Sequence, residues 1–347
     1  MSHKSAAKKP NFALRFVVLI VLFFVVALVS LWLGKYSDIS ILDVPKILLN
    51  ATGLCNFAQT WGDGAYSSVV NVRLPRVLAA ILIGAALSVA GASYQGMFRN
   101  PMVSPDILGA TNGAGFGAAL AILLGMGWFG ITIQAFIFGL AAVLIAYGIS
   151  RFSRVNPILS MVLAGMVISS LFGSAISFIK LIADTEEQLP AITYWLMGSL
   201  ASTQLKSVAY ACIPVFIGLV PLIILRWRMN LLTAGEDEAR AMGINTNLLR
   251  GIVIACATLM TTACVAISGV IGWVGLVIPH FCRMIYGSDF RKIIPAAIFM
   301  GAAFLLVADD FARMITTSEI PIGILTSFVG APVFVYLIIT GGLRRES

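Results

Sequence analysis

Long apolar runs, separated by short polar or Gly- and Pro-containing segments, follow one another along nearly the whole chain of 347 residues. About 20 apolar residues are enough for a helix to cross the hydrocarbon core of a bilayer. The pattern therefore predicts an all-α, polytopic membrane protein. It places about ten transmembrane helices, near residues 12–34, 74–97, 107–127, 131–150, 157–182, 207–226, 252–268, 272–287, 295–315 and 322–341.

Two segments depart from this regular pattern. The run at 191–204 is too short to cross, so we expect an interfacial helix with Tyr194 and Trp195 at headgroup level. Three glycines interrupt the apolar stretch that leads into 272–287, at positions Gly269, Gly272 and Gly275. One of the spans beside them should be short or broken.

Polar segments are too short to form a second domain, so we expect a single transmembrane domain over residues 1–347. Its polar parts are a tail at 1–11 and a loop at 227–249. The first apolar run ends in LWLGKY, with no small-residue cleavage site, which favours a retained first span over a cleaved signal.

Composition agrees with the membrane assignment and indicates the orientation. Charged residues make up 11% of the chain, against about 25% in soluble domains. The net charge of +8 does not indicate nucleic-acid binding, because 16 of the 23 Lys and Arg residues lie at the termini or in loops on the same predicted side. The positive-inside rule makes that side, with both termini, cytoplasmic.

A weak internal repeat is present at an offset of 178 residues. It pairs Gly91, Pro101 and Gly109 with Gly269, Pro279 and Gly287. This offset contains five spans, an odd number. A genuine repeat would therefore consist of two five-helix halves with inverted topology.

Charged residues near the ends of spans are candidates for function, since charge inside a membrane is costly. Arg73, Arg76 and Arg313 could reach lipid phosphates or form a docking surface for an acidic partner. Asp309 and Arg313 are four residues apart and can pair on one helix face. The alternative for Asp309, and for the otherwise unexplained Asp310, is an ion-coupling site.

The loop from Arg226 to Arg250 contains a short helical pattern. Glu236, Asp237 and Glu238 open it, where acidic groups suit the helix dipole. Ala239, Ala241 and Met242 follow as a small-residue face, and Gly243 can cap the helix.

Two other segments allow both a structural and a functional interpretation. The serines of the span 157–182 can serve close helix packing or line a mildly polar path. His280, after Pro279, could relay protons, but without an acidic partner nearby in sequence a structural role in a broken helix is favoured.

Sequence signals for chemistry are absent. The chain has no G-x-x-x-x-G-K-[ST] phosphate loop, no His/Cys/Asp cluster with metal-ligand spacing, and no catalytic constellation. We therefore expect no enzymatic activity, no metal site and no cofactor in this chain.

Several motifs occur in an order that resembles one family. They read RLPRVLAAILIGAALSVAGASYQGMFRNPMVSPDILG (73–109), EARAMG (238–243), IGWVGLVIPH (271–280) and SEIPIG (318–323). Over about residues 70–345 the chain resembles the permease subunit of ABC importers for iron–siderophores, haem and cobalamin. The resemblance implies the type II importer fold.

The resemblance also implies residue roles. Docking to an external binding protein is implied for Arg73, Arg76 and Arg313. Coupling to an ATPase is implied for Glu236, Glu238, Ala239, Arg240, Met242 and Gly243, with Arg240 departing from the family's alanine. Translocation-path residues would come from the fifth and last spans, as Ser160, Ser169, Ser170, Ser174 and Ser327. Structural motif positions are Gly91, Asn100, Pro101, Gly109, Pro279 and His280.

The implied assembly contains a second permease copy, as a homodimer, together with two cytoplasmic ATPases that bind ATP-Mg and an extracytoplasmic binding protein. It would lie in the bacterial cytoplasmic membrane. A ferric siderophore is the favoured substrate, with haem and cobalamin as alternatives. The predicted path contains no ring of cations, which argues against a small naked anion but does not distinguish these three ligands. The competing hypothesis is an ion-gradient-driven carrier that uses Asp309, Asp310 or His280; it gives the EARAMG loop no role.

Overall fold

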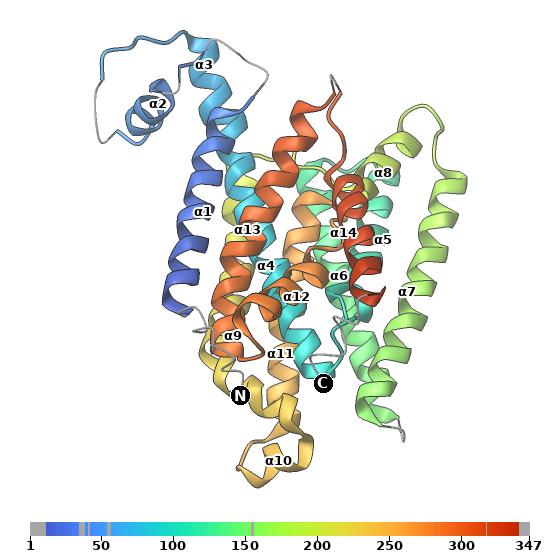
Figure 1. Cartoon of the computed structure of the whole chain (residues 1–347). Helices are drawn as coiled ribbons and strands as arrows, with labels where there is room; N and C mark the ends of the chain where they lie inside the picture. The colour runs from blue at the N-terminus through green and yellow to red at the C-terminus, as the bar shows by residue number, and fades with distance from the viewer. Residues whose placement is uncertain are drawn as a thin grey trace, which may run out of the picture.

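A computed structural model describes residues 12–34, 39–40, 42–53, 57–153, 156–316 and 318–339. Within these ranges every regular element is a helix (Figure 1). The elements are α1 (Phe12–Trp32), α2 (Asp43–Ala51), α3 (Asp63–Ser67), η1 (Ser68–Arg73), α4 (Leu74–Phe98), η2 (Pro105–Leu108), α5 (Ala110–Leu123), α6 (Trp128–Phe152), α7 (Pro157–Ile182), α8 (Gln188–Met197), α9 (Leu205–Ala234), α10 (Glu236–Ala241), α11 (Thr246–Ser268), α12 (Val274–Tyr286), α13 (Phe290–Met314) and α14 (Ile322–Ile339).

The ten predicted spans are confirmed as helices. Seven helical stretches are long and apolar enough to cross a membrane, and one of them runs continuously from Asp63 to Phe98. Shorter apolar helices, α5, α12 and α14, occupy the other three predicted positions. The expected short span is α12, whose 13 residues extend about 20 Å, less than the hydrocarbon thickness of about 30 Å.

Helix α4 lies at the centre of the bundle, where α9, α11, α12 and α13 surround it (Figure 1). Glycine allows this close packing. A Cβ atom on Gly91 would clash with the carbonyl oxygen of Gly275 in α12, and one on Gly84 would clash with that of Gly301 in α13. Gly91 is thus a helix-contact position, as expected of a structural motif residue.

The repeat predicted at an offset of 178 residues is wrong in its register. Gly91 lies inside α4 but Gly269 follows the end of α11; Gly109 precedes α5 but Gly287 follows α12. The order of helix lengths nevertheless recurs. Helices α4, α5 and α6 have 25, 14 and 25 residues, and α11, α12 and α13 have 23, 13 and 25. The offset between α4 and α11 is already smaller than 178 residues, and the link before α12, which is shorter than the link before α5, reduces the offset of the next helices further.

The two ends of the bundle differ in what they carry. Helices α2 and α3 lie at one end, called the α2 end below, and α10 projects from the other, called the α10 end (Figure 1). Helix α1 begins at the α10 end, where the Arg15 guanidinium donates to the Ile285 carbonyl at 2.6 Å. It runs beside α13, against which Phe23 packs on Phe299 with 5.5 Å between ring centroids.

Candidate functional site

A buried ion cluster joins four segments at the α2 end, and Arg76 is its centre. Pro75 cannot donate to the preceding turn, and the helix widens to a π-helix over Ser68–Arg73 just before it. Arg76 Nε donates to both Asp309 carboxylate oxygens at 2.7 and 3.0 Å. Its Nη1 donates to Glu319 Oε2 at 2.7 Å. The pair of Arg76 and Asp309 is almost completely buried, with exposed fractions of 3% and 1%.

Arg313 and Asp310 extend the cluster to helix α1. Arg313 pairs with Asp310, one turn earlier in α13. It also donates to the Ser30 carbonyl at 2.6 Å and to the Leu33 carbonyl at 3.1 Å. Asp310 accepts a second hydrogen bond from Ser30 Oγ at 2.6 Å. The structure thereby explains Asp310, which the sequence left without a role.

The expected pairing of Asp309 with Arg313 is present but secondary, because Arg313 Nε lies 3.7 Å from Asp309 Oδ2 while Arg76 is closer. Arg73 donates to the last carbonyls of α1, at 2.5 Å to Trp32. All three arginines are 5% exposed or less. They hold α1, α4 and α13 together in this structure, and their docking role stays a prediction.

At the opposite end, the predicted short helix is confirmed as α10, Glu236–Ala241. Its first turn is acidic, and Gly243 follows it in the left-handed region with φ at +79°. The Gly243 N–H donates to the Arg240 carbonyl at 2.9 Å, as in a glycine-capped helix end. Glu236 accepts from Arg240 at 2.6 Å and from Arg250 of α11 at 2.9 Å. This second contact ties α10 to α11.

The side chains of α10 and of Met242, which directly follows it, face two environments. Ala239 is fully buried against the bundle, whereas Met242 is 64% exposed. An apolar side chain this exposed on a charged, water-facing loop is suited to packing against another protein. The structure supports the shape expected of a coupling helix; the coupling role itself stays a prediction.

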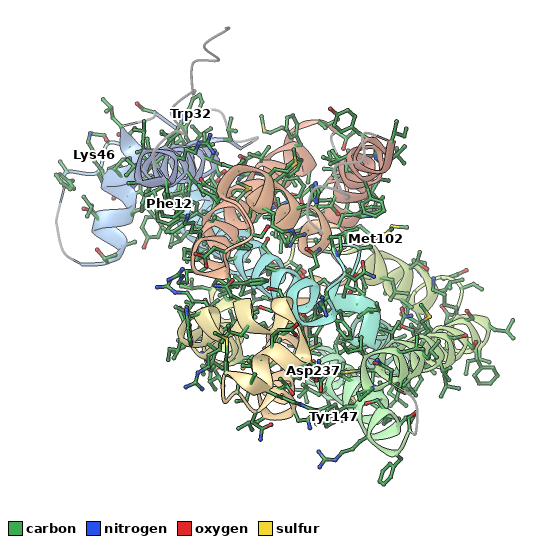
Figure 2. The ribbon with its side chains drawn as sticks, turned by 60° about the horizontal axis from the view of Figure 1, so that its bottom comes forward. Phe12, Trp32, Lys46, Met102, Tyr147 and Asp237 are labelled. Atoms are coloured by element: carbon green, nitrogen blue, oxygen red, sulfur yellow. The ribbon has the colours of Figure 1, made fainter. Side chains whose placement is uncertain are left out.

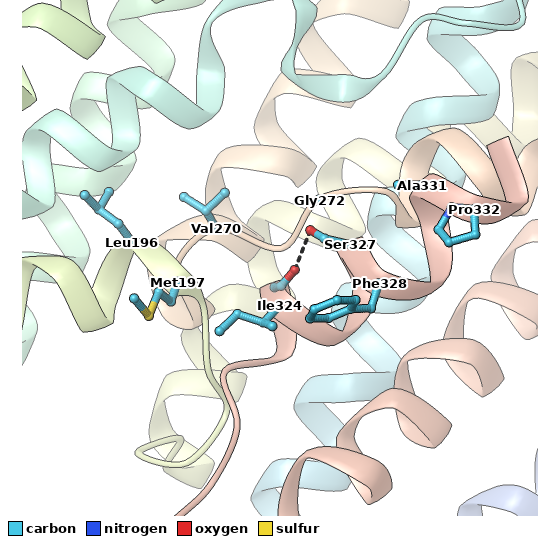
Figure 3. A pocket seen from close by; sticks show the side chains of 10 residues that line it. Leu196, Met197, Val270, Gly272, Ile324, Ser327, Phe328, Ala331 and Pro332 are labelled. Carbon is cyan, nitrogen blue, oxygen red and sulfur yellow. Dashed lines mark hydrogen bonds between the residues drawn. The ribbon is translucent and has the colours of Figure 1, made fainter. Parts of the chain in front are cut away.

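Between these ends, a cavity of about 670 Å³ opens where α8, the α11–α12 link and α14 meet (Figure 3). Its lining residues are Leu196, Met197, Val270, Gly272, Gly323, Ile324, Ser327, Phe328, Ala331 and Pro332. None of these described residues carries a charge. The Ser327 hydroxyl donates to the Gly323 carbonyl at 2.7 Å, so the helix backbone satisfies its donor. The lining suits a ligand with a large, weakly polar surface.

Glycines bring these three segments together. The Ser199 N–H donates to the Ser268 carbonyl at 2.8 Å, and the Ile322 N–H donates to the Gly198 carbonyl at 2.9 Å. A Cβ atom on Gly198 or Gly323 would clash with neighbouring carbonyls. Loop backbone of this kind is tolerated at membrane depth where it is buried in protein or lines a cavity.

Of the five predicted path residues, Ser327 lines this cavity and the four α7 serines do not. Ser160 is buried and donates to Ser153 Oγ at 2.7 Å. Ser170 and Ser174 lie on the exposed face of α7, and Ser169 is half-buried beside Gly109. Leu196, Val270 and Phe328 also line the cavity and were not predicted; the only sequence signal near them was the interruption of the apolar run at Gly269 and Gly272.

The remaining motif positions shape the ends of helices. Asn100 accepts from the Met102 N–H at 2.9 Å in the turn that follows α4, and Pro101 lies within that turn. Gly109, with φ at +85°, directly precedes α5 as its N-cap residue. Pro279 and His280 lie inside α12, where His280 is 2% exposed.

Comparison with known proteins gives consistent matches. The FecCD transport family matches residues 20–340. The molybdate import permease of Haemophilus influenzae is 38% identical, covering 94% of this chain and 96% of its own. A probable iron chelatin permease of Helicobacter pylori is 40% identical over 78% of this chain and 82% of its own. Haemin and cobalamin permeases also match. The structure of an inward-facing putative metal-chelate ABC transporter superposes with a TM-score of 0.84 at 36% identity, covering 94% of this chain and 99% of that one.

Proposed function

Because the chain belongs to the FecCD transport family, as a multi-pass permease of an ABC transporter, we propose that it imports an iron chelate, with a ferric siderophore as the favoured substrate. The cavity beside Ser327 carries this proposal. Its volume and uncharged lining suit a metal enclosed in an organic shell. Haem and cobalamin share that character. Molybdate, the substrate in the name of one relative, is a small anion and would need cationic or N–H donors.

The permease would work as a pair of identical copies. Exposed apolar side chains on α7 and α14 offer a surface for the second copy, including Leu163, Val167, Leu171, Phe328 and Tyr336. Such a pair would place the cavity of each copy near a shared axis. Two ATPases, which would bind ATP-Mg, would sit against α10, so hydrolysis would belong to those subunits and not to this chain.

Orientation follows from charge. The α10 end carries Arg240, Arg250 and Arg291, so we place it in the cytoplasm, with both termini on the same side. The protein would then lie in a bacterial cytoplasmic membrane with its α2 end outside, where a binding protein would deliver the chelate.

Movement would reach the cavity through α11. This helix of 23 residues extends about 35 Å, from the Arg250 contact with α10 to the link that lines the cavity. A shift of α10 on ATP binding would therefore displace the link at Val270 and Gly272 and change access to the cavity.

Docking at the α2 end would involve the ion cluster indirectly. Glu319 is the most exposed acid of the cluster, at 31%, and it occupies the Arg76 guanidinium. A carboxylate of the binding protein would reach Arg76 by replacing Glu319.

Uptake by proteoliposomes tests the proposal. The permease would be reconstituted with its ATPase and binding protein and offered labelled ferric siderophore, haemin, cobalamin and molybdate. Iron-chelate uptake that needs both ATP and the binding protein is expected. Uptake of molybdate alone would contradict the substrate, and uptake driven by an imposed proton or sodium gradient without ATP would contradict the transporter class. Glu238→Ala in α10 should abolish ATP-dependent uptake. Glu186→Ala, which removes an exposed carboxylate at the other end, is the control and should leave uptake unchanged.

A further inference from the structure

A second, smaller cavity lies at the α10 end, away from the path. Its volume is about 320 Å³, and it lies between the end of α4, the end of α6, the start of α7 and the start of α11. Its polar lining consists of Ser150, Arg151, Ser153, Asn247 and Arg250. Figure 2 views the molecule from this end, with Tyr147 of α6 and Asp237 of α10 labelled.

This polar cavity continues into an apolar groove of about 350 Å³ between α6 and α11. Both are lined by Tyr147, Gly251 and Ile254, so the two spaces adjoin. The groove runs on along Leu144 and Leu259. Leu144 is 67% exposed, so the groove opens to the lipid-facing side of the bundle.

The polar cavity contains more positive charge than the nearby carboxylates neutralise. Arg250 is 14% exposed and donates one Nη2 hydrogen bond to Glu236 at 2.9 Å. Its Nε is buried without a hydrogen-bond partner among the described residues. Glu236 is shared with Arg240, and the described lining of the cavity contains no acid. A buried donor without a partner is costly and favours a ligand that accepts hydrogen bonds.

We propose that one anionic phospholipid, from the leaflet at the α10 end, occupies these joined spaces. Its phosphate would lie beside Arg250 and Arg151, with Asn247 and Ser150 as further polar contacts, and one acyl chain would fill the groove between α6 and α11. Basic pockets between transmembrane helices are suited to anionic headgroups, and the adjoining apolar groove suits a chain that a free phosphate lacks. A zwitterionic headgroup brings its own cation and gains less from two arginines.

This lipid would act on α10, because the guanidinium that lines the cavity also holds Glu236. A phosphate beside Arg250 competes with Glu236 for the same donors. Anionic lipid should therefore alter how firmly α10 is tied to α11. Binding itself requires no substrate, so its measurement stands apart from the proposed import function.

The groove can be blocked without disturbing the bundle. A Cβ atom on Gly251 would meet only the Tyr147 hydroxyl oxygen, at 3.9 Å, so Gly251→Leu places its side chain in the junction of the two spaces. Gly148→Leu is the matched control: no atom lies within 4 Å of its Cβ position, and it lines neither space. Arg151→Gln tests the headgroup contact.

Retained lipid would be measured by native mass spectrometry of the permease–ATPase complex after exchange into equal phosphatidylglycerol and phosphatidylcholine. The wild type and Gly148→Leu should retain about one phosphatidylglycerol per permease. Gly251→Leu should lose it, and Arg151→Gln should lower the preference over phosphatidylcholine by roughly fivefold.

Four outcomes would overturn the proposal. Equal retention of both lipids would show that the arginines do not select an anionic headgroup. Full retention by Gly251→Leu, or displacement by millimolar inorganic phosphate alone, would remove the role of the groove. Retention by the isolated permease but not by the complex would show that an ATPase, and not lipid, covers the cavity.

Discussion

The two ends of this molecule hold charges of the same kinds in opposite physical settings. At the α2 end, Arg76 and Asp309 pair with exposed fractions of 3% and 1%. At the α10 end, Arg240 and Glu236 pair with exposed fractions of 57% and 35%. A buried pair is costly to break from one side, while an exposed pair contributes little to stability. The first set of charges therefore holds helices together, and the second is available for contacts with other molecules.

The largest expected effect comes from breaking the buried pair on one side. Arg76→Gln would leave Asp309 buried without its main partner, and we expect unfolding free energy to fall by about 3–5 kcal/mol. Thermal unfolding in detergent would measure this. Replacing both partners, as Arg76→Met with Asp309→Leu, should recover most of the loss; a double variant as unstable as the single one would contradict this account of the cluster.

A smaller effect is expected at the edge of the same cluster. Ser30→Ala removes the hydroxyl that donates to Asp310 at 2.6 Å, while Arg313 remains as partner. Hydrogen bonds to charged groups contribute about 1.5–3 kcal/mol, so the same unfolding assay should detect a loss near the lower bound. Ser177→Ala on the exposed face of α7 is the control. Equal stability of the two variants would mean that α1 is not fixed through Asp310.

The α10 end should behave in the reverse manner. Glu236→Ala removes both pairs of α10. The pair with Arg240 is exposed and contributes only about 0.2–1 kcal/mol, while Arg250 is 14% exposed, so we expect the unfolding free energy to fall by less than in Arg76→Gln. ATP-dependent uptake should nevertheless fall strongly, because α10 loses its tie to α11. Glu187→Ala controls for the loss of a surface carboxylate. If the variant transports at the wild-type rate, the contact between α10 and α11 is not needed for coupling.

The smallest effect concerns pH at Asp289, the residue that precedes α13. Burial raises the pKa of this carboxyl, but hydrogen bonds from Arg291 and Asn230 outweigh it and hold the pKa below its usual value. Its contribution is therefore present above the unfolded pKa of about 4 and is lost as pH falls through the folded value. Asp289→Asn should remove about 0.5 kcal/mol at pH 7 and flatten the acid limb of the stability profile. An unchanged acid limb would show that Asp289 does not contribute to the pH dependence of stability.

Local features were predictable. The acidic first turn and Gly243 indicated α10, since capping and dipole effects depend on neighbours along the chain. The three glycines at 269–275 likewise indicated that one of the spans beside them is short or broken, and the structure shows that the short one is α12. The partner of Asp309 was not predictable in this way. Helix spacing pointed to Arg313, four residues away, whereas the shortest contact is with Arg76, 233 residues away in sequence.

The candidate cavity also combines one residue that was predicted from the sequence with others that were not. Ser327 was identified from its position in the last span, but the other lining residues belong to α8 and to the link after α11, which meet through backbone contacts at Gly198 and Gly323. The family resemblance also pointed to the serines of α7, of which Ser160 is buried and bonded to Ser153, Ser169 is half-buried beside Gly109, and Ser170 and Ser174 lie on the exposed face. Polarity in a span does not distinguish a residue that lines a path from one that lies on the outer face of the bundle.

The sequence by itself determined where the apolar helices lie and where the polar loop between them falls, because hydrocarbon thickness sets a length that a long apolar run must meet. Only the tertiary structure decided which charges are buried and which cavities form. Those outcomes depend on how closely α4 approaches α12 and α13, at Gly91 and Gly84, and such contacts join residues that no local pattern relates.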